Sequence, residues 1–125
     1  MSRRPAGASL LNPPLSELPR LDGPSARAIA PLVGIGGKSA DTVVGLSALR
    51  RSRPLALIFA SPELAEGTLA ELAGWRREGA LLFVVEEWEV VAGRVGRPDA
   101  LVLGIRPGPL AEGISRRLQA SGAGE

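Results

Sequence analysis

The 125-residue sequence predicts one α/β domain, a three-layer α/β/α sandwich around a small central sheet. Three continuous apolar runs, at residues 55–60, 80–85 and 100–105, have the pattern of strands that are covered on both faces. The segments between these runs contain helix-capping residues and apolar residues at helical spacing. Strands that alternate with helices at short intervals indicate helices on both sides of a sheet. The length is sufficient to bury a core without disulfides or metals.

Residues 1–24 contain five of the eleven prolines. Because proline fixes φ and donates no backbone hydrogen bond, this stretch is predicted to be a disordered N-terminal arm, although its leucines would also allow it to lie along the domain surface. The α/β/α domain is predicted to span residues 25–119. Residues 120–125, most of them small, are predicted to form a flexible tail.

The first two predicted helices lie on either side of a glycine-rich segment. Ser25 is predicted to cap a short helix over residues 26–32. Residues 34–37 are predicted to form a flexible break, because glycine has wide backbone freedom. A second helix is expected to start at Ser39 or Asp41 and to end in three arginines, where the helix dipole favours positive charge.

The later helices are predicted from their first residues. Residues 61–63, Ser-Pro-Glu, combine a hydroxyl cap, a proline in the first turn and an acid beside the positive end of the dipole, so a helix is predicted from there to Gly79. A helix or helical turn is expected over residues 86–93, and the last helix over residues 109–118.

The chain contains no Cys, His or Tyr. This composition excludes zinc sites, thiol chemistry and imidazole acid–base chemistry, so we expect a protein that is not an enzyme and that has no metal or cofactor. Glu86, Glu87 and Glu89 lack histidine partners and are interpreted as a solvated helix start. Trp75 and Trp88 are predicted to pack in the core rather than to stack on bases.

Membrane and secretory segments are not predicted. No apolar run reaches the roughly 18–20 residues that are needed to span a bilayer. The N-terminal residues lack an apolar stretch long enough for a secretory signal. The expected location is the cytoplasm.

The net charge is only +2, so nucleic-acid binding would depend on a local patch of cations. Two glycine-containing segments carry such cations. Small residues around Lys38, ahead of the expected second helix, would expose backbone amides to a phosphate, although the phosphate-loop motif itself fails because Leu32 stands where its first glycine is required. Around Arg94, glycines would let the backbone approach RNA beside guanidinium groups, although a solvated charged surface would have the same pattern. The candidate RNA-binding residues are Gly36, Gly37, Lys38, Ser39, Gly93, Arg94, Gly96 and Arg97.

Several ordered stretches between Val43 and Leu118 resemble a known superfamily of ribosomal proteins. The stretches are residues 48–51, 57–60, 64–72, 91–105 and 108–114. In order and spacing they are similar to the L-seven-Ae and L-thirty-e proteins, which bind kink-turn RNA, and to their bacterial YlxQ-type relatives. The resemblance implies an L-thirty-e-like α/β/α sandwich. It also implies an RNA surface made by the start of the second helix and the loop before the last strand, at about residues 37–44 and 94–100.

The resemblance implies a non-catalytic RNA-binding or ribosome-associated protein. Its expected partners are structured or ribosomal RNA and ribosome components, and no membrane partner is expected. Kink-turn binders carry a Gly-x-Asn-Glu run and a nearby lysine at the helix start. Counted back from Ala60, those positions hold residues 41–44, Asp-Thr-Val-Val, and Ser47, so binding is expected to be largely to the RNA backbone. The alternative is a protein-interaction domain on the same fold that has lost RNA binding, which the low net charge favours.

Overall fold

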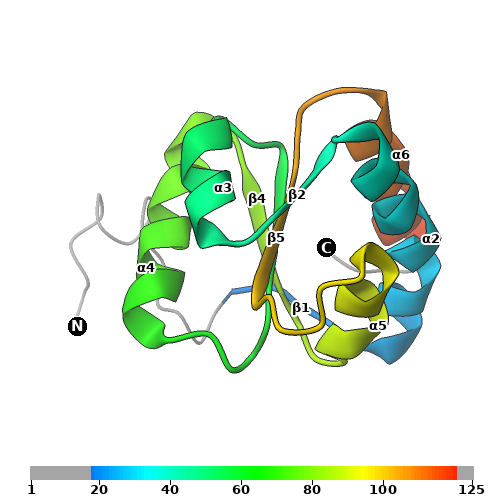
Figure 1. Cartoon of the computed structure of the whole chain (residues 1–125), viewed down its shortest axis with the longest axis horizontal. Coiled ribbons are helices and arrows are strands. Elements are labelled where there is room, and N and C mark those ends of the chain that lie inside the picture. The colour runs from blue at the N-terminus through cyan, green and yellow to red at the C-terminus, as the bar shows by residue number, and fades with distance from the viewer. Residues whose placement is uncertain (1–17, 121–125) are drawn as a thin grey trace, which may run out of the picture.

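A five-stranded mixed sheet runs through the middle of the computed structural model, which describes residues 18–120 (Figure 1). The strand order is β1-β4-β3-β5-β2. Strands β1, β4 and β3 are parallel, whereas β5 is antiparallel to both β3 and β2. The strands are β1 (Arg20–Leu21), β2 (Thr42–Val44), β3 (Leu57–Ala60), β4 (Leu81–Val85) and β5 (Val102–Ile105).

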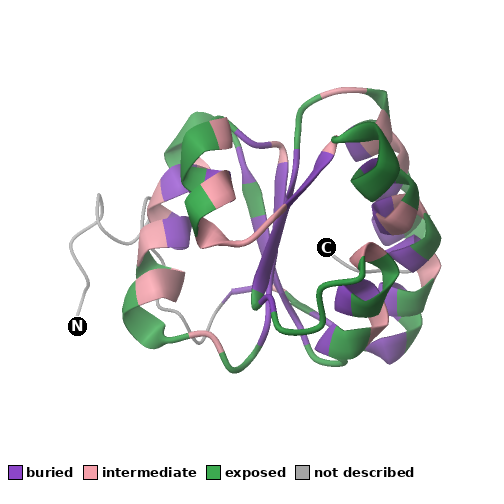
Figure 2. Cartoon of the chain, in the orientation of Figure 1, coloured by how far each residue is buried: buried purple, intermediate pink, exposed green. Residues whose placement is uncertain are grey.

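Helices cover both faces of this sheet. Figure 1 shows α2, α5 and α6 on one side and α3 and α4 on the other, and Figure 2 shows the buried residues concentrated between these layers. The predicted α/β sandwich is therefore confirmed. The helices are α2 (Gly23–Ser39), α3 (Leu46–Ser52), α4 (Glu66–Gly74), α5 (Trp88–Ala92) and α6 (Pro109–Ala120), with 3-10 turns η2 (Trp75–Glu78) and η3 (Gly93–Val95).

The three predicted apolar runs are β3, β4 and β5. All four residues of β3 are buried, and alternate side chains enter two different clusters: Leu57 and Phe59 pack under α2 and α6, while Ile58 packs under α3 and α4. Both tryptophans are buried, as predicted, with Trp75 5% and Trp88 6% exposed. Continuous apolar runs predicted these strands because both faces of the sheet are covered.

The predicted boundary at residue 24 between the N-terminal arm and the domain is wrong, because β1 and the start of α2 already belong to the domain. Leu21 is fully buried, and β1 pairs with Val84 and Val85 of β4. Prolines do not prevent this pairing: Pro19 contributes only its carbonyl, which accepts a hydrogen bond from the Val84 amide at 2.9 Å, and Pro24 lies in the first turn of α2, where an amide has no helical partner. The remaining arm, residues 1–17, and residues 121–125 of the predicted tail lie outside the described residues.

The predicted break at residues 34–37 is wrong, because α2 is one continuous helix from Gly23 to Ser39. The predicted start of a second helix at Ser39 or Asp41 is also wrong. Ala40, with a φ of 68°, ends α2, and the chain then forms the edge strand β2 before α3 begins at Leu46. Each glycine inside a helix lowers its stability by about 1 kcal/mol relative to alanine. Neighbouring residues pack closely against Gly34, Gly36 and Gly37, and this packing offsets the cost.

The predicted helix from residue 61 starts later, at Glu66. The Ser61 hydroxyl accepts a hydrogen bond from the Glu63 amide at 3.1 Å, as a cap would, but it closes a separate turn before the helix. The last two helices follow the prediction more closely, with α5 beginning at Trp88 and α6 at Pro109. Within residues 18–120, no helix has both the length and the apolar character to cross a membrane.

Candidate functional site

The C-terminal half of α2 presents bare backbone to its neighbours. A Cβ atom on Gly34 would lie 3.3 Å from the Cβ of Arg94, and one on Gly37 would lie 3.4 Å from a methyl carbon of Val95. The turn η3 therefore packs directly against the glycine surface of the helix. This contact brings together the two segments that the sequence singled out, and the reason is close packing rather than loop flexibility.

Lys38 and Arg94 line one open pocket at this contact. The other lining residues are Pro31, Gly34 and Ile35, and the pocket volume is about 200 Å³. Four of the five lining residues come from α2 at helical spacing, so they share one face of that helix. Within residues 18–120, neither Lys38 nor Arg94 forms an ion pair or a hydrogen bond through its side chain. We call this feature the Lys38–Arg94 pocket.

The predicted backbone amides are not available beside Lys38. Gly36, Gly37 and Ser39 lie in the last turns of α2, where amides donate to the helix's own carbonyls and the terminal carbonyls are left without helical partners. The Ser39 hydroxyl donates to Asp41 Oδ2 at 2.8 Å. Of the four candidates in this segment, only Lys38 therefore offers a group that attracts phosphate.

Cations offset the negative end of the α2 dipole. Lys38 stands in the last turn, and Arg106 Nε donates a hydrogen bond to the Ala40 carbonyl at 2.9 Å. Arg106 reaches this position from the end of β5, next to β2. Arg106 could not be identified from the sequence, because only the sheet order shows that its strand ends beside the end of α2.

The second candidate segment divides into two parts. Arg94 faces α2, whereas Arg97 Nε lies 3.5 Å from Asp99 Oδ1 and is not among the residues that line the Lys38–Arg94 pocket. Gly96 ends η3 with a φ of 70°, which glycine adopts without strain, and Gly93 is an exposed residue at the start of η3. These two glycines shape the turn that carries Arg94.

Two other arginines hold helices together on the opposite face of the sheet. Arg50 Nε and Nη2 each donate to the Glu71 carboxylate at 2.8 Å, which connects α3 with α4. Arg53 pairs with Glu78, and its guanidinium lies 4.6 Å from the ring centroid of Trp75. The hydrogen bond from Arg50 lowers the pKa of Glu71 from its ordinary value. These arginines have internal partners, so the run at residues 50–53 is a weaker candidate for an RNA contact.

The carboxyl edge of the parallel strands carries a different pocket, of about 280 Å³. It lies beside the loop that enters β5, where the Gly45 amide, at the start of α3, donates to the Val102 carbonyl at 3.1 Å. The family resemblance implies an RNA surface at a helix start near residues 37–44, but these residues form the end of α2 and the strand β2. The next helix, α3, has its N-cap at Gly45. Three carboxylates on the pocket disfavour phosphate there. The lining residues are Ser61, Pro62, Glu63, Glu86, Trp88, Glu89, Pro98 and Leu101.

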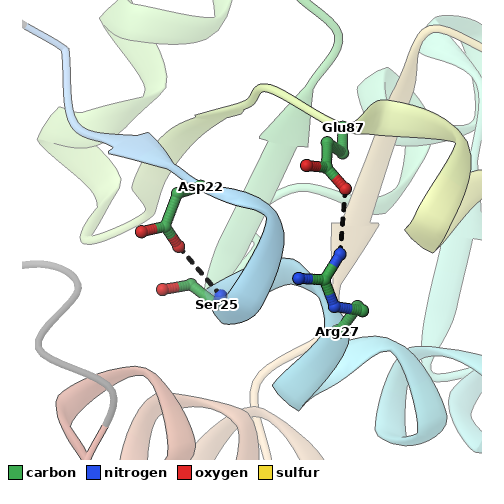
Figure 3. A network of polar contacts seen from close by, with 4 residues as sticks. All are labelled: Asp22, Ser25, Arg27 and Glu87. Carbon is green, nitrogen blue, oxygen red and sulfur yellow. Dashed lines mark hydrogen bonds and ion pairs between the residues drawn. The ribbon is translucent and has the colours of Figure 1, made fainter.

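The chain's own carboxylates occupy the N-terminal end of α2 (Figure 3). Asp22 Oδ1 accepts a hydrogen bond from the Ser25 amide at 2.9 Å, which lowers the pKa of Asp22. Glu87 Oε1 lies 3.0 Å from Arg27 Nη1, and a Cβ on Gly23 would lie 2.3 Å from the other carboxylate oxygen of Glu87. Anions at this position stabilise the helix dipole. No group of three or more acids within residues 18–120 is arranged to hold a metal ion.

Comparisons with known proteins identify a similar fold but no activity. No family model matches the chain, and no curated protein matches it. Among solved structures, the chain is similar to a protein of unknown function from Bacillus halodurans C, with a TM-score of 0.59 and 14% sequence identity. The match covers 75% of this chain and 98% of that chain. At this identity the likeness shows a shared fold alone.

Proposed function

We propose that the protein is a non-catalytic RNA-binding or ribosome-associated domain that contacts the RNA backbone through Lys38 and Arg94. One observation carries the proposal: two cations from segments far apart in the sequence line the same open pocket and have no ion pair within residues 18–120. An ammonium and a guanidinium group both form charge-assisted hydrogen bonds with phosphate oxygens. A cytoplasmic location is part of the same proposal.

The resemblance to the L-seven-Ae and L-thirty-e superfamily supports this proposal, and membership of that superfamily is part of it. Selective binding of kink-turn RNA is not part of it. The start of α3, Gly45-Leu46-Ser47, contains neither the asparagine nor the glutamate of that motif. The acidic pocket at the adjacent sheet edge also disfavours a close RNA backbone. The Lys38–Arg94 pocket on α2 is therefore the preferred contact.

The test compares two variants that lose the same charge. In Lys38→Ala/Arg94→Ala, RNA affinity should fall about tenfold at about 0.1 M salt, measured by fluorescence anisotropy with a short oligouridylate. The control, Arg20→Ala/Arg116→Ala, removes two exposed arginines outside the pocket and should bind within about twofold of the parent.

The salt dependence provides a second readout. Each lost phosphate contact should make the slope of log affinity against log salt less steep by about 0.7 for single-stranded RNA. Equal affinities for the pocket variant, the control and the parent would contradict the proposal. An unchanged slope in a weaker pocket variant would also contradict it, because the lost contacts would then not be phosphate contacts.

The alternative, a protein-interaction domain, is favoured by the pocket at the carboxyl edge of the sheet. Its prolines, tryptophan and leucine give it an apolar lining, and its glutamates would attract basic side chains. If the parent protein binds neither single-stranded nor structured RNA, the protein-interaction domain becomes the preferred function, with the pocket at the carboxyl edge of the sheet as its candidate surface.

A further inference from the structure

Ile35 is the most exposed large hydrophobic residue within residues 18–120, with 58% of its surface accessible. On the same helix, Ile29 and Val33 are fully buried against the sheet. Ile35 is on the opposite side of α2, where it lines the Lys38–Arg94 pocket together with Pro31. An isolated exposed aliphatic residue is ordinary, but this one forms, with Pro31, the apolar part of a pocket that is also lined by the cations Lys38 and Arg94.

Gly34 also lines this pocket, between Pro31 and Ile35 on α2. Its bare backbone allows Arg94 to approach the helix closely, because a Cβ atom on Gly34 would lie 3.3 Å from the Cβ of Arg94. The pocket has apolar walls from Pro31 and Ile35 and positive charge from Lys38 and Arg94. Its volume, about 200 Å³, is below the range of about 300–1,000 Å³ that is usual for whole small-molecule ligands. It therefore suits one group of a larger ligand.

We propose that the Lys38–Arg94 pocket holds a single unpaired RNA nucleotide, with the base against Ile35 and Pro31 and the phosphate between Lys38 and Arg94. This inference rests on the proposed function and adds the structural class of RNA that the site selects. A nucleotide combines a flat base, whose faces are apolar, with an anionic phosphate, which is the combination that these four side chains match. In an RNA duplex the bases are paired and stacked, so only an unpaired base is free to contact Ile35.

The contact with Ile35 favours no particular base, since every base has an apolar face. The protein is therefore expected to prefer single-stranded over fully paired RNA at an equal number of phosphates. Its affinities for oligouridylate and oligoadenylate should be similar.

The experiment uses the full-length chain, the variant Ile35→Ser and the control Leu81→Ser. Leu81 is 49% exposed at the start of β4 and does not line the pocket. Anisotropy is measured with oligouridylate, with a hairpin duplex of equal phosphate number and with an oligonucleotide whose sugars lack bases. Ile35→Ser should weaken oligouridylate binding about fivefold through lost apolar contact. It should leave the affinities for the duplex and the base-free strand unchanged, while Leu81→Ser should bind all three as the parent does.

The outcomes separate this inference from the proposed function. If Lys38→Ala/Arg94→Ala loses affinity while Ile35→Ser does not, the backbone contact stands and the nucleotide pocket is wrong. Equal losses on oligouridylate and on the base-free strand would also overturn the nucleotide pocket, because no base would then contact Ile35. If the parent binds no RNA, or if the Lys38 and Arg94 variant binds like the parent, the proposed function fails and this inference fails with it. Circular dichroism of each variant checks that the fold is retained.

Discussion

The hydroxyl oxygen of Thr42 lies 2.1 Å from the position that a Cβ atom on Gly36 would occupy. The same hydroxyl donates a hydrogen bond to the Val33 carbonyl of α2 at 3.0 Å, so β2 lies directly on the backbone of the helix that precedes it. Leu110 of α6 also reaches this point, 2.4 Å from the same Cβ position. Gly36 is therefore required by close packing, although it lies in the interior of a helix.

Two glycine-to-alanine substitutions, one at this contact and one at a helical glycine without close neighbours, should change the stability in opposite directions. Gly36→Ala should lower the free energy of unfolding by about 1–3 kcal/mol, since the new methyl group overpacks the contact with Thr42. Gly67→Ala, in α4, has nothing within 4 Å of its Cβ and should raise the free energy of unfolding by about 0.5–1 kcal/mol through better helix propensity. Urea unfolding of both variants measures these changes. A stabilising Gly36→Ala would show that β2 does not lie on α2 at this point.

Leu21 should contribute strongly to stability because β1 belongs to the domain. Its side chain is fully buried among residues of α2, α5 and the sheet. Leu21→Ala should lower the free energy of unfolding by about 2–5 kcal/mol. Arg20→Ala, at the exposed neighbouring position, should change it by less than about 0.5 kcal/mol. Similar thermal midpoints for the two variants would mean that β1 does not pack as described.

The ion pair between Arg50 and Glu71 should make part of the stability dependent on pH. Because Arg50 lowers the pKa of Glu71 in the folded state, the contribution is fully present above the ordinary glutamate pKa and is lost as pH falls through the lowered value. The thermal midpoint of Glu71→Gln should therefore lie below that of the parent at neutral pH, and the difference should shrink in acid. The effect should be small, since both side chains are partly exposed. A difference that grows in acid would contradict this assignment.

Arg97 and Arg94 should differ in their effects on RNA binding, although only two residues lie between them in the sequence. Arg94 lines the pocket with Lys38, whereas Arg97 lies beside the Asp99 carboxylate. Arg94→Ala should therefore weaken oligouridylate binding several-fold more than Arg97→Ala, in the same anisotropy assay and at equal salt. Equal losses would extend the RNA contact beyond the pocket to the loop before β5.

The three central strands and the α/β class were readable from the sequence because a strand that is covered on both faces must be apolar along its whole length. Strands β1 and β2, of two and three residues, are too short to show such a pattern. They form because neighbouring strands offer unpaired edges. The prolines around β1 pointed to an unpacked arm, yet Pro19 needs only its carbonyl to join the sheet.

The candidate site divides in the same way. Lys38 and Arg94 could be selected from the sequence as cations near glycines, and the structure places both on one pocket. Ile35 was not selected, since its position four residues after Pro31 has meaning only if the helix continues through the glycines. Glycine's local preference opposes a helix by about 1 kcal/mol per residue, whereas the packing of Arg94, Val95 and Thr42 against its bare backbone favours one. The sequence by itself determined which side chains carry charge and which strands are buried. Tertiary packing decided that residues 34–37 are helical, and hence which residues share the pocket.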